Sequence, residues 1–288
     1  MYIDLRGIGS GRLLITKLIS GGDMKAYRTV LINFILLSII AVFGFQGYSD
    51  VSVEGSLFRE KTVAAGDFYR GSIVVSNNGS SPRQIEVYQS DYRTFKDGKI
   101  KYGDPGEIPR SNANWIDINL DQVEIPAGEK ERIDFEVQVP EDDLSGTYWS
   151  ALMIEPLSPA DEEGQGTFIK QKVRYCVKIV TNIGDTGKRK LKVIGADLFK
   201  KGEKVFFNLG LHNTGGRLLY PTVTMELYDN KTGEKVGKFK GGRKHIFPGN
   251  AVPFRIAMEK ITGGEYKAIF VFDNGDEYVW GTQYKINI

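Results

Sequence analysis

The chain has few of the residue types from which most metal sites and many catalytic sites are built. Its 288 residues include one cysteine and two histidines. One cysteine excludes an intramolecular disulfide and a zinc site made of several cysteines, and two histidines leave little material for histidine-based catalysis. No phosphate-binding glycine loop and no metalloprotease or hydrolase motif stands in a supporting context. The sequence therefore predicts a protein with no enzymatic activity, no cofactor and no bound metal ion.

An excess of either charge is also missing. Lysine and arginine number 38 against 36 aspartate and glutamate residues, which gives a formal net charge of +2. Nucleic-acid binders usually gather a basic excess on one face, so no nucleic acid is expected as a partner. The composition is 41% hydrophobic and 11% aromatic, enough for a sizeable core, which excludes a wholly disordered chain.

One long apolar run stands near the N-terminus. Residues 30–45 read VLINFILLSIIAVFGF, with Lys25 and Arg28 just before them and small residues at Gly47 and Ser49 just after. A basic start, a short apolar stretch and small residues at the exit are typical of a secretory signal peptide. The run is short for a spanning helix, which needs about 20 apolar residues, so a retained anchor is the alternative. We expect residues 1–47 to be an N-terminal extension and signal peptide, with Met1 or Met24 as the start, and no stable membrane span after cleavage.

The rest of the chain reads as β-strands. Short runs rich in β-branched and aromatic residues alternate with clusters of Gly, Asn, Asp and Pro, which predicts a sandwich or barrel. In residues 132–139, RIDFEVQV, apolar residues alternate with polar ones, as in a strand with one buried face. The other predicted strands are the runs at 71–79, 84–92, 147–156, 172–182, 204–215, 222–230 and 266–275. No segment after residue 45 shows a helical period, so the predicted fold class is all-β.

The strands fall into two similar halves. Each half has a strand ending in N-x-G, then a turn containing Pro and Gly, then a strand opening with G-x-Y. A polar, basic stretch at 182–190 separates them. We therefore predict two tandem immunoglobulin-like β-sandwiches after the signal peptide, at residues 48–182 and 183–288.

Five segments of the first half carry a family resemblance: VVSN at 74–77, Trp115-Ile116, VEIPAGE at 123–129, IEP at 154–156 and KVRYCVKIV at 172–180. With these segments, the first half resembles the N-terminal domain of the periplasmic chaperones that assemble pili. A weaker similarity is to WxL-associated cell-surface proteins that carry a similar domain. The resemblance implies a protein that adds its last strand to the sheet of an exported subunit. It also implies two basic side chains that hold the subunit's terminal carboxylate.

These implied roles fall on particular residues. Lys178 matches the strand lysine of the pilus chaperones, and the first-strand cation corresponds to Lys61 or to the nearby Arg59. The predicted partner-binding row on the last strand alternates along the chain and consists of Ile169, Val173, Tyr175, Val177 and Ile179. The alternative for this stretch is an ordinary half-buried strand with a solvated basic face.

The sequence thus predicts a non-enzymatic exported protein of the periplasm or cell surface. Its expected partner is an exported protein subunit or a cell-envelope polymer, which it binds as a pilus-type chaperone or assembly factor through an edge strand. The alternative function is a structural or carbohydrate-binding surface module, for which an exposed pair among Trp115, Trp149 and Trp280 would supply the platform.

Overall fold

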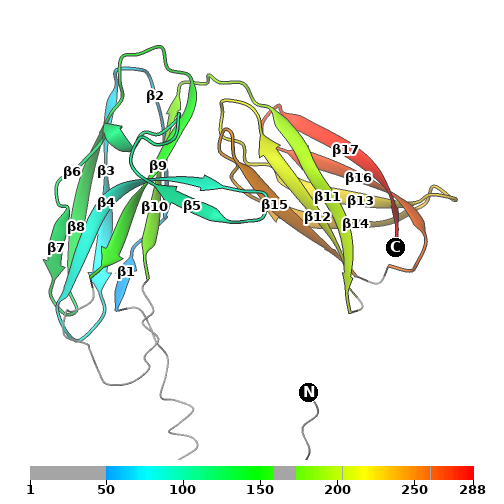
Figure 1. Cartoon of the computed structure of the whole chain (residues 1–288), viewed down its shortest axis with the longest axis horizontal. Helices are drawn as coiled ribbons and strands as arrows, with labels where there is room; N and C mark the ends of the chain where they lie inside the picture. The colour runs from blue at the N-terminus through cyan, green and yellow to red at the C-terminus, as the bar shows by residue number, and fades with distance from the viewer. Residues whose placement is uncertain (1–49, 158–172, 203, 260) are drawn as a thin grey trace, which may run out of the picture. The chain divides into compact units, whose positions relative to one another are not determined.

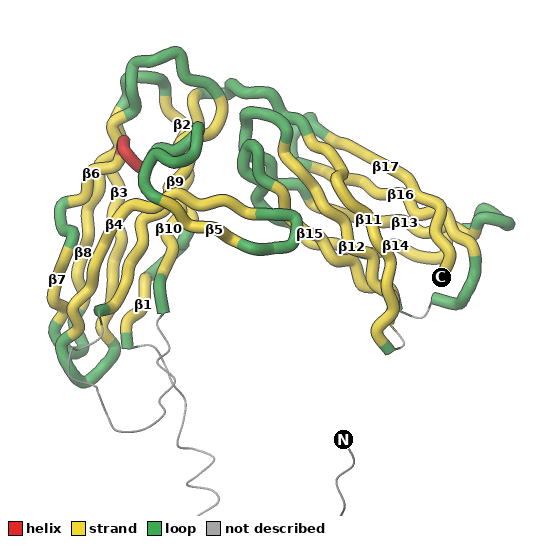
Figure 2. The backbone as a smooth tube through the Cα atoms, viewed as in Figure 1, coloured by secondary structure: helices red, strands yellow, loops and turns green. Residues whose placement is uncertain are grey.

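The computed structural model describes residues 50–157, 173–202, 204–259 and 261–288, and Asp50–Ile288 forms one compact unit. Its regular structure is β-strands together with one short 3-10 helix, η1 (Ala113–Trp115) (Figure 2). In this described part, no helix has the length and hydropathy needed to cross a membrane. The all-β prediction is confirmed, and the signal segment predicted at 1–47 lies outside the described residues.

The first sandwich contains the strands from β1 to β10 (Figure 1). One sheet has the order β1-β3-β8-β6, formed by β1 (Val51–Val53), β3 (Phe68–Asn77), β8 (Lys130–Gln138) and β6 (Ile116–Ile118). The other has the order β2-β10-β9-β4-β5, formed by β2 (Phe58–Val63), β10 (Tyr175–Ile183), β9 (Gly146–Pro156), β4 (Arg83–Thr94) and β5 (Ile100–Gly103), with β7 (Gln122–Ile125) also paired to β4.

The second sandwich contains the strands from β11 to β17. One sheet has the order β11-β12-β15, formed by β11 (Leu191–Lys201), β12 (Lys204–Asn213) and β15 (Ala251–Met258). The other has the order β14-β13-β16-β17, formed by β14 (Lys235–Arg243), β13 (Thr222–Asp229), β16 (Glu265–Asp273) and β17 (Val279–Asn287). The chain is thus two tandem immunoglobulin-like sandwiches, as the strand pattern predicted.

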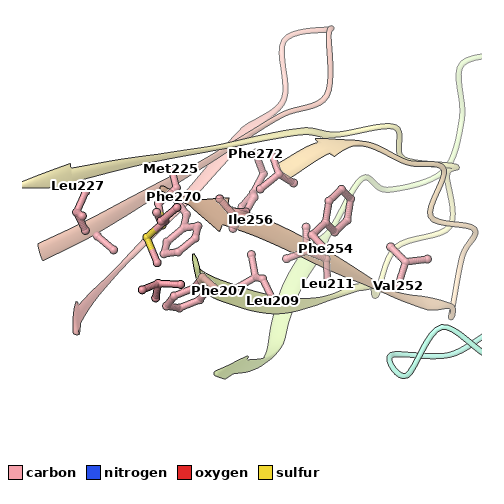
Figure 3. Close-up of a cluster of buried hydrophobic side chains, with 14 of the residues drawn as sticks. Phe207, Leu209, Leu211, Met225, Leu227, Val252, Phe254, Ile256, Phe270 and Phe272 are labelled. Atoms are coloured by element: carbon pink, nitrogen blue, oxygen red, sulfur yellow. The ribbon is translucent and has the colours of Figure 1, made fainter. Parts of the chain in front are cut away.

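Each sandwich has its own core, built from the inward half of each alternating strand. On β8, Ile133, Phe135 and Val137 are all buried, whereas the residues between them face outward, which confirms the period-2 prediction. Figure 3 shows the second core, where Phe207, Leu209 and Leu211 of β12 lie opposite side chains of the other sheet. Those opposing residues include Met225, Leu227, Phe270 and Phe272.

A third apolar cluster covers the outer face of the first sandwich's larger sheet. Trp149, Ala151 and Met153 of β9 belong to it, together with Val180 of β10 and with Phe247 from the loop before β15. Because the other face of β9 contributes Leu152 and Ile154 to the first core, β9 is buried on both sides. Phe247 and the partly buried Leu218, both from loops of the second half, thus pack against the sheet that contains β10.

The N-x-G repeat is visible in the hydrogen bonds at the end of β12. The buried Asn213 side chain donates through Nδ2 to the carbonyls of Ile246 at 2.8 Å and Arg217 at 2.7 Å. Its Oδ1 accepts from the N–H of Gly215 at 2.9 Å. The Asn213 carbonyl accepts from the N–H of Gly249, which has a φ of 73°. One asparagine therefore joins the end of β12 to the Pro-Gly turn before β15.

The first sandwich repeats this arrangement at the end of β3. Asn77 donates through Nδ2 to the carbonyls of Ile125 at 2.9 Å and Ser81 at 2.8 Å, and its Oδ1 accepts from Gly79 at 3.0 Å. Its carbonyl accepts from Gly128, whose φ is 76°. The two halves therefore repeat the hydrogen bonds of this asparagine as well as the sequence around it.

Candidate functional site

The strand predicted to bind a partner, β10, is paired on both sides over part of its length. It is antiparallel to β9 from Tyr175 to Ile183, and it is parallel to β2 from Lys178 onward, where Lys178 lies opposite Phe58. The N–H of Lys178 donates to the carbonyl of Leu57 at 2.9 Å. Among the described strands, only β9 pairs with residues 175–177. The first three residues of β10 therefore form an open sheet edge on the β2 side.

Most of the predicted apolar row points into the core of the first sandwich. Val177 and Ile179 are fully buried there, and Tyr175 packs against the same core with its hydroxyl donating to the carbonyl of Val51 at 2.6 Å. Val173 is half-buried and precedes the strand, whereas Ile169 lies outside the described residues. The described residues of the row therefore have the geometry of an ordinary half-buried strand, which was the alternative to a partner-binding row. A partner could meet this stretch through its open backbone edge but not through Val177 or Ile179.

Lys178 lies on the other face of β10 and points toward the third apolar cluster. Its Nζ lies 5.6 Å from the centroid of the Tyr92 ring. Nearby, the His245 ring stacks between two aromatic rings, with centroids 4.0 Å from Phe58 and 3.9 Å from Tyr220. The lysine is therefore held beside a stack that joins β2 to two loops of the second sandwich.

The two first-strand cations are not brought to the face of Lys178. In a parallel pair, residues opposite each other share a face, and the register places Arg59 opposite Ile179 and Lys61 opposite Thr181. Because side chains alternate along β10, both cations fall on the opposite face from Lys178. The Nε of Arg59 is buried with no hydrogen-bond partner among the described residues, and Lys61 is exposed. Any pairing of Lys178 with a second cation on its own face must use a different residue.

Arg243 is a cation that lies beside the same stack of rings. Its guanidinium carbon lies 4.1 Å from the centroid of Tyr220, and its Nε donates to the Tyr220 carbonyl at 2.9 Å. Burial, together with the positive charges of Lys178 and Arg243, lowers the pKa of His245 to about 4. His245 is therefore neutral at pH 7, and Lys178 and Arg243 each supply a positive charge near it. No feature of the sequence predicted the ring partners of His245.

The low pKa of His245 predicts a loss of stability in acid. Its folded pKa of about 4 lies below its ordinary value of 6.5, so the unfolded chain binds a proton first as the pH falls. The free energy of unfolding should therefore fall by about 2 kcal/mol between pH 6.5 and 4. This is less than the pKa shift multiplied by ~1.36 kcal/mol per unit would give, because the ring is partly exposed to solvent. Urea unfolding across this pH range measures the loss. The His245→Phe variant keeps a stacked ring without a proton site, and an equally steep loss in that variant would contradict the assignment.

Several other residues marked by the sequence have structural roles. Burial raises the pKa of the Cys176 thiol, which keeps it protonated and weakly nucleophilic. Trp149 is buried, and Trp115 and Trp280 pack against the two cores, so the described tryptophans offer no exposed pair for a sugar. In the described ranges, no group of three or more His, Cys, Asp or Glu side chains is placed to hold a metal ion.

Comparison with known proteins gives structural matches alone. Neither a family model nor a curated protein matches this chain. Among solved structures, it is similar to a chain of a chaperone–tip adhesin complex of CFA/I fimbriae, at 12% identity and a TM-score of 0.44, covering 82% of this chain and 98% of that chain. It is also similar to the class 5 fimbriae chaperone CfaA, at 12% identity and a TM-score of 0.42, with 82% and 98% covered.

A third match comes from the CsuC–CsuE chaperone–tip adhesion subunit pre-assembly complex of Acinetobacter baumannii. The identity is 14%, the TM-score is 0.42, and the match covers 83% of this chain and 98% of that chain. Fimbrial chaperones are thus among the solved structures to which the chain is similar.

Proposed function

We propose that this chain is a non-enzymatic, exported assembly factor that binds another polypeptide of the cell envelope by strand addition at β10. The single observation that supports this proposal best is the open backbone edge at residues 175–177, next to the point where β2 begins to pair. An extended peptide can add to such an edge through main-chain hydrogen bonds. In this proposal the chain works in the periplasm or at the cell surface after loss of residues 1–47.

The proposal assigns the binding surface to specific groups. The N–H of Lys178 points to the β2 side, so the N–H groups of Cys176 and Arg174 point the same way, because backbone directions alternate along a strand. Lys178 and Arg243 supply positive charge near the end of that edge, in place of the Lys61 or Arg59 pairing predicted from the sequence. Residues 48–182 would carry this surface, and residues 183–288 would form the second domain. The proposed boundary falls at the end of β10.

Replacing Cys176 by proline tests strand addition directly. Proline removes the outward N–H at this edge and leaves the β9-facing N–H groups of Tyr175 and Val177 in place. We expect Cys176→Pro to reduce the amount of co-purifying envelope polypeptide at least tenfold, as measured by affinity capture from envelope extract and mass spectrometry. The matched control, Cys176→Ala, loses the thiol but keeps the N–H and should capture the same polypeptide as the unmodified protein.

The same experiment can overturn the proposal. Equal capture by the proline variant, with its circular dichroism spectrum unchanged, would show that the β10 edge is not used. Retention of the protein on purified cell-wall glycan, without a captured polypeptide, would favour the surface-module alternative instead.

A further inference from the structure

A pocket of about 310 Å³ lies beside Trp149 and has no residue of β10 in its lining. Its walls include Ile108, Trp149 and Pro248, all of which are buried. Two arginines, Arg93 and Arg110, also line it, and no aspartate or glutamate does. An apolar wall with a few convergent polar groups is the usual composition of a small-molecule site, and this volume is at the small end of the range.

The two arginines carry positive charge that the described residues do not neutralise. Neither guanidinium forms an ion pair with a described carboxylate, and Arg93 is exposed. Arg110 is held in place because it donates through Nη1 to the Ser145 carbonyl at 2.6 Å and lies 5.3 Å from the Tyr148 ring centroid. A fixed guanidinium loses little conformational freedom when it binds an anion. The pocket therefore favours a negatively charged group.

Asn250 adds a donor that has no acceptor. The residue is 4% exposed, and its Nδ2 is buried without a hydrogen-bond partner in the part of the chain that the structure describes. Its backbone is fixed, since its N–H donates to Phe247 and its carbonyl accepts from Asn213, each at 3.0 Å. An unpaired buried donor costs about 1–3 kcal/mol. A ligand oxygen that accepts from this amide would remove that cost.

We propose that this pocket binds a small molecule with a carboxylate on an apolar body. The carboxylate lies between Arg93 and Arg110, whose planar groups match its geometry. The apolar body lies against Ile108, Trp149 and Pro248, and Asn250 donates to an acceptor oxygen of the ligand. The apolar wall and small volume favour such a group over a strongly hydrated phosphate. This activity is separate from strand addition, because the pocket shares no residue with the edge of β10.

The test uses the whole exported chain and N-acetyl-L-leucinate as the probe. We expect a saturable shift of the indole N–H resonance of Trp149, assigned with Trp149→Phe. N-acetyl-L-leucinamide, which lacks the charge, and inorganic phosphate, which lacks the apolar body, should each bind at least tenfold more weakly. Cys176→Pro should leave the binding of the probe unchanged, so this result and that for strand addition are independent.

Substitutions identify the groups that bind. Arg93→Met should weaken binding at least tenfold, whereas Arg70→Met, at an exposed arginine of β3 outside this pocket, should change it less than twofold. Asn250→Asp replaces the donor by a like charge and should abolish binding. If Asn250→Asp does not fold, Arg93→Met still tests the proposal, because the Arg93 side chain is exposed and its replacement should not prevent folding. Absence of saturable binding, equal affinity for the amide or for phosphate, or unchanged binding by Arg93→Met would each overturn the proposal.

Discussion

Gly146→Ala is expected to lower the free energy of unfolding by about 3 kcal/mol or more. Gly146 begins β9 with a φ of 78°, in the left-handed region that side chains disfavour. A Cβ built there would overlap the carbonyl oxygen of Gly216. That carbonyl cannot move away freely, because it accepts from the N–H of Thr147 at 2.9 Å. The added methyl group therefore meets a main-chain carbonyl that a hydrogen bond to Thr147 holds in place.

Gly233→Ala is the matched control for this loss. Gly233 has nearly the same φ, 76°, but a Cβ there meets nothing within 4 Å. Gly233→Ala should lower the free energy of unfolding by only about 1–2 kcal/mol, the cost of a side chain at this positive φ. Urea unfolding of both variants separates the two contributions, and the thermal midpoint should follow by about 2–4 °C per kcal/mol. Equal losses at the two glycines would show that the contact between Gly146 and Gly216 does not limit stability.

Much of the fold was predictable because alternation is a local property. The strand at 132–139 could be assigned to one buried face from its residues alone, and the runs at 71–79 and 204–215 became β3 and β12. By contrast, β2 reads FREKTV and has no apolar alternation. It becomes a strand because β10 offers it a partner, and a single sequence does not show which distant segments pair.

The candidate site was harder to predict for the same reason. The sequence placed Lys178 on a strand, which is β10, but the face of Lys61 depends on the register between β2 and β10. A shift of one residue in that register would exchange the faces. The stack of Phe58, His245 and Tyr220 likewise joins three segments that are far apart in the sequence. The burial of Val177 and Ile179 was foreseen only as the alternative to a partner-binding row.

The repeated asparagines give the second large effect. We expect Asn213→Ala to lower the free energy of unfolding by about 2–4 kcal/mol, because it removes the buried amide that donates to the carbonyls of Ile246 and Arg217. The Ile246 carbonyl keeps the N–H of Leu219 as a donor. Asn77→Ala should cost a similar amount, since Asn77 makes the same set of bonds in the first sandwich. Urea unfolding measures both losses. Asn208→Ala on β12 is the control, because its bonds to Asp197 and Arg255 are exposed, and about 0.5 kcal/mol is expected there.

Asn213→Asp separates the loss of the amide donor from the loss of side-chain volume. The aspartate has nearly the same volume and keeps the acceptor for Gly215, but its second oxygen faces the carbonyls of Ile246 and Arg217. Burial and these oxygens raise the pKa of that carboxyl in the folded protein. Stability should therefore fall as the pH rises above about 3.9, the ordinary aspartate value, and should level off above the raised pKa. If Asn213→Asp is as stable as the unmodified protein at pH 7, the two carbonyl bonds are not what joins β12 to its turn.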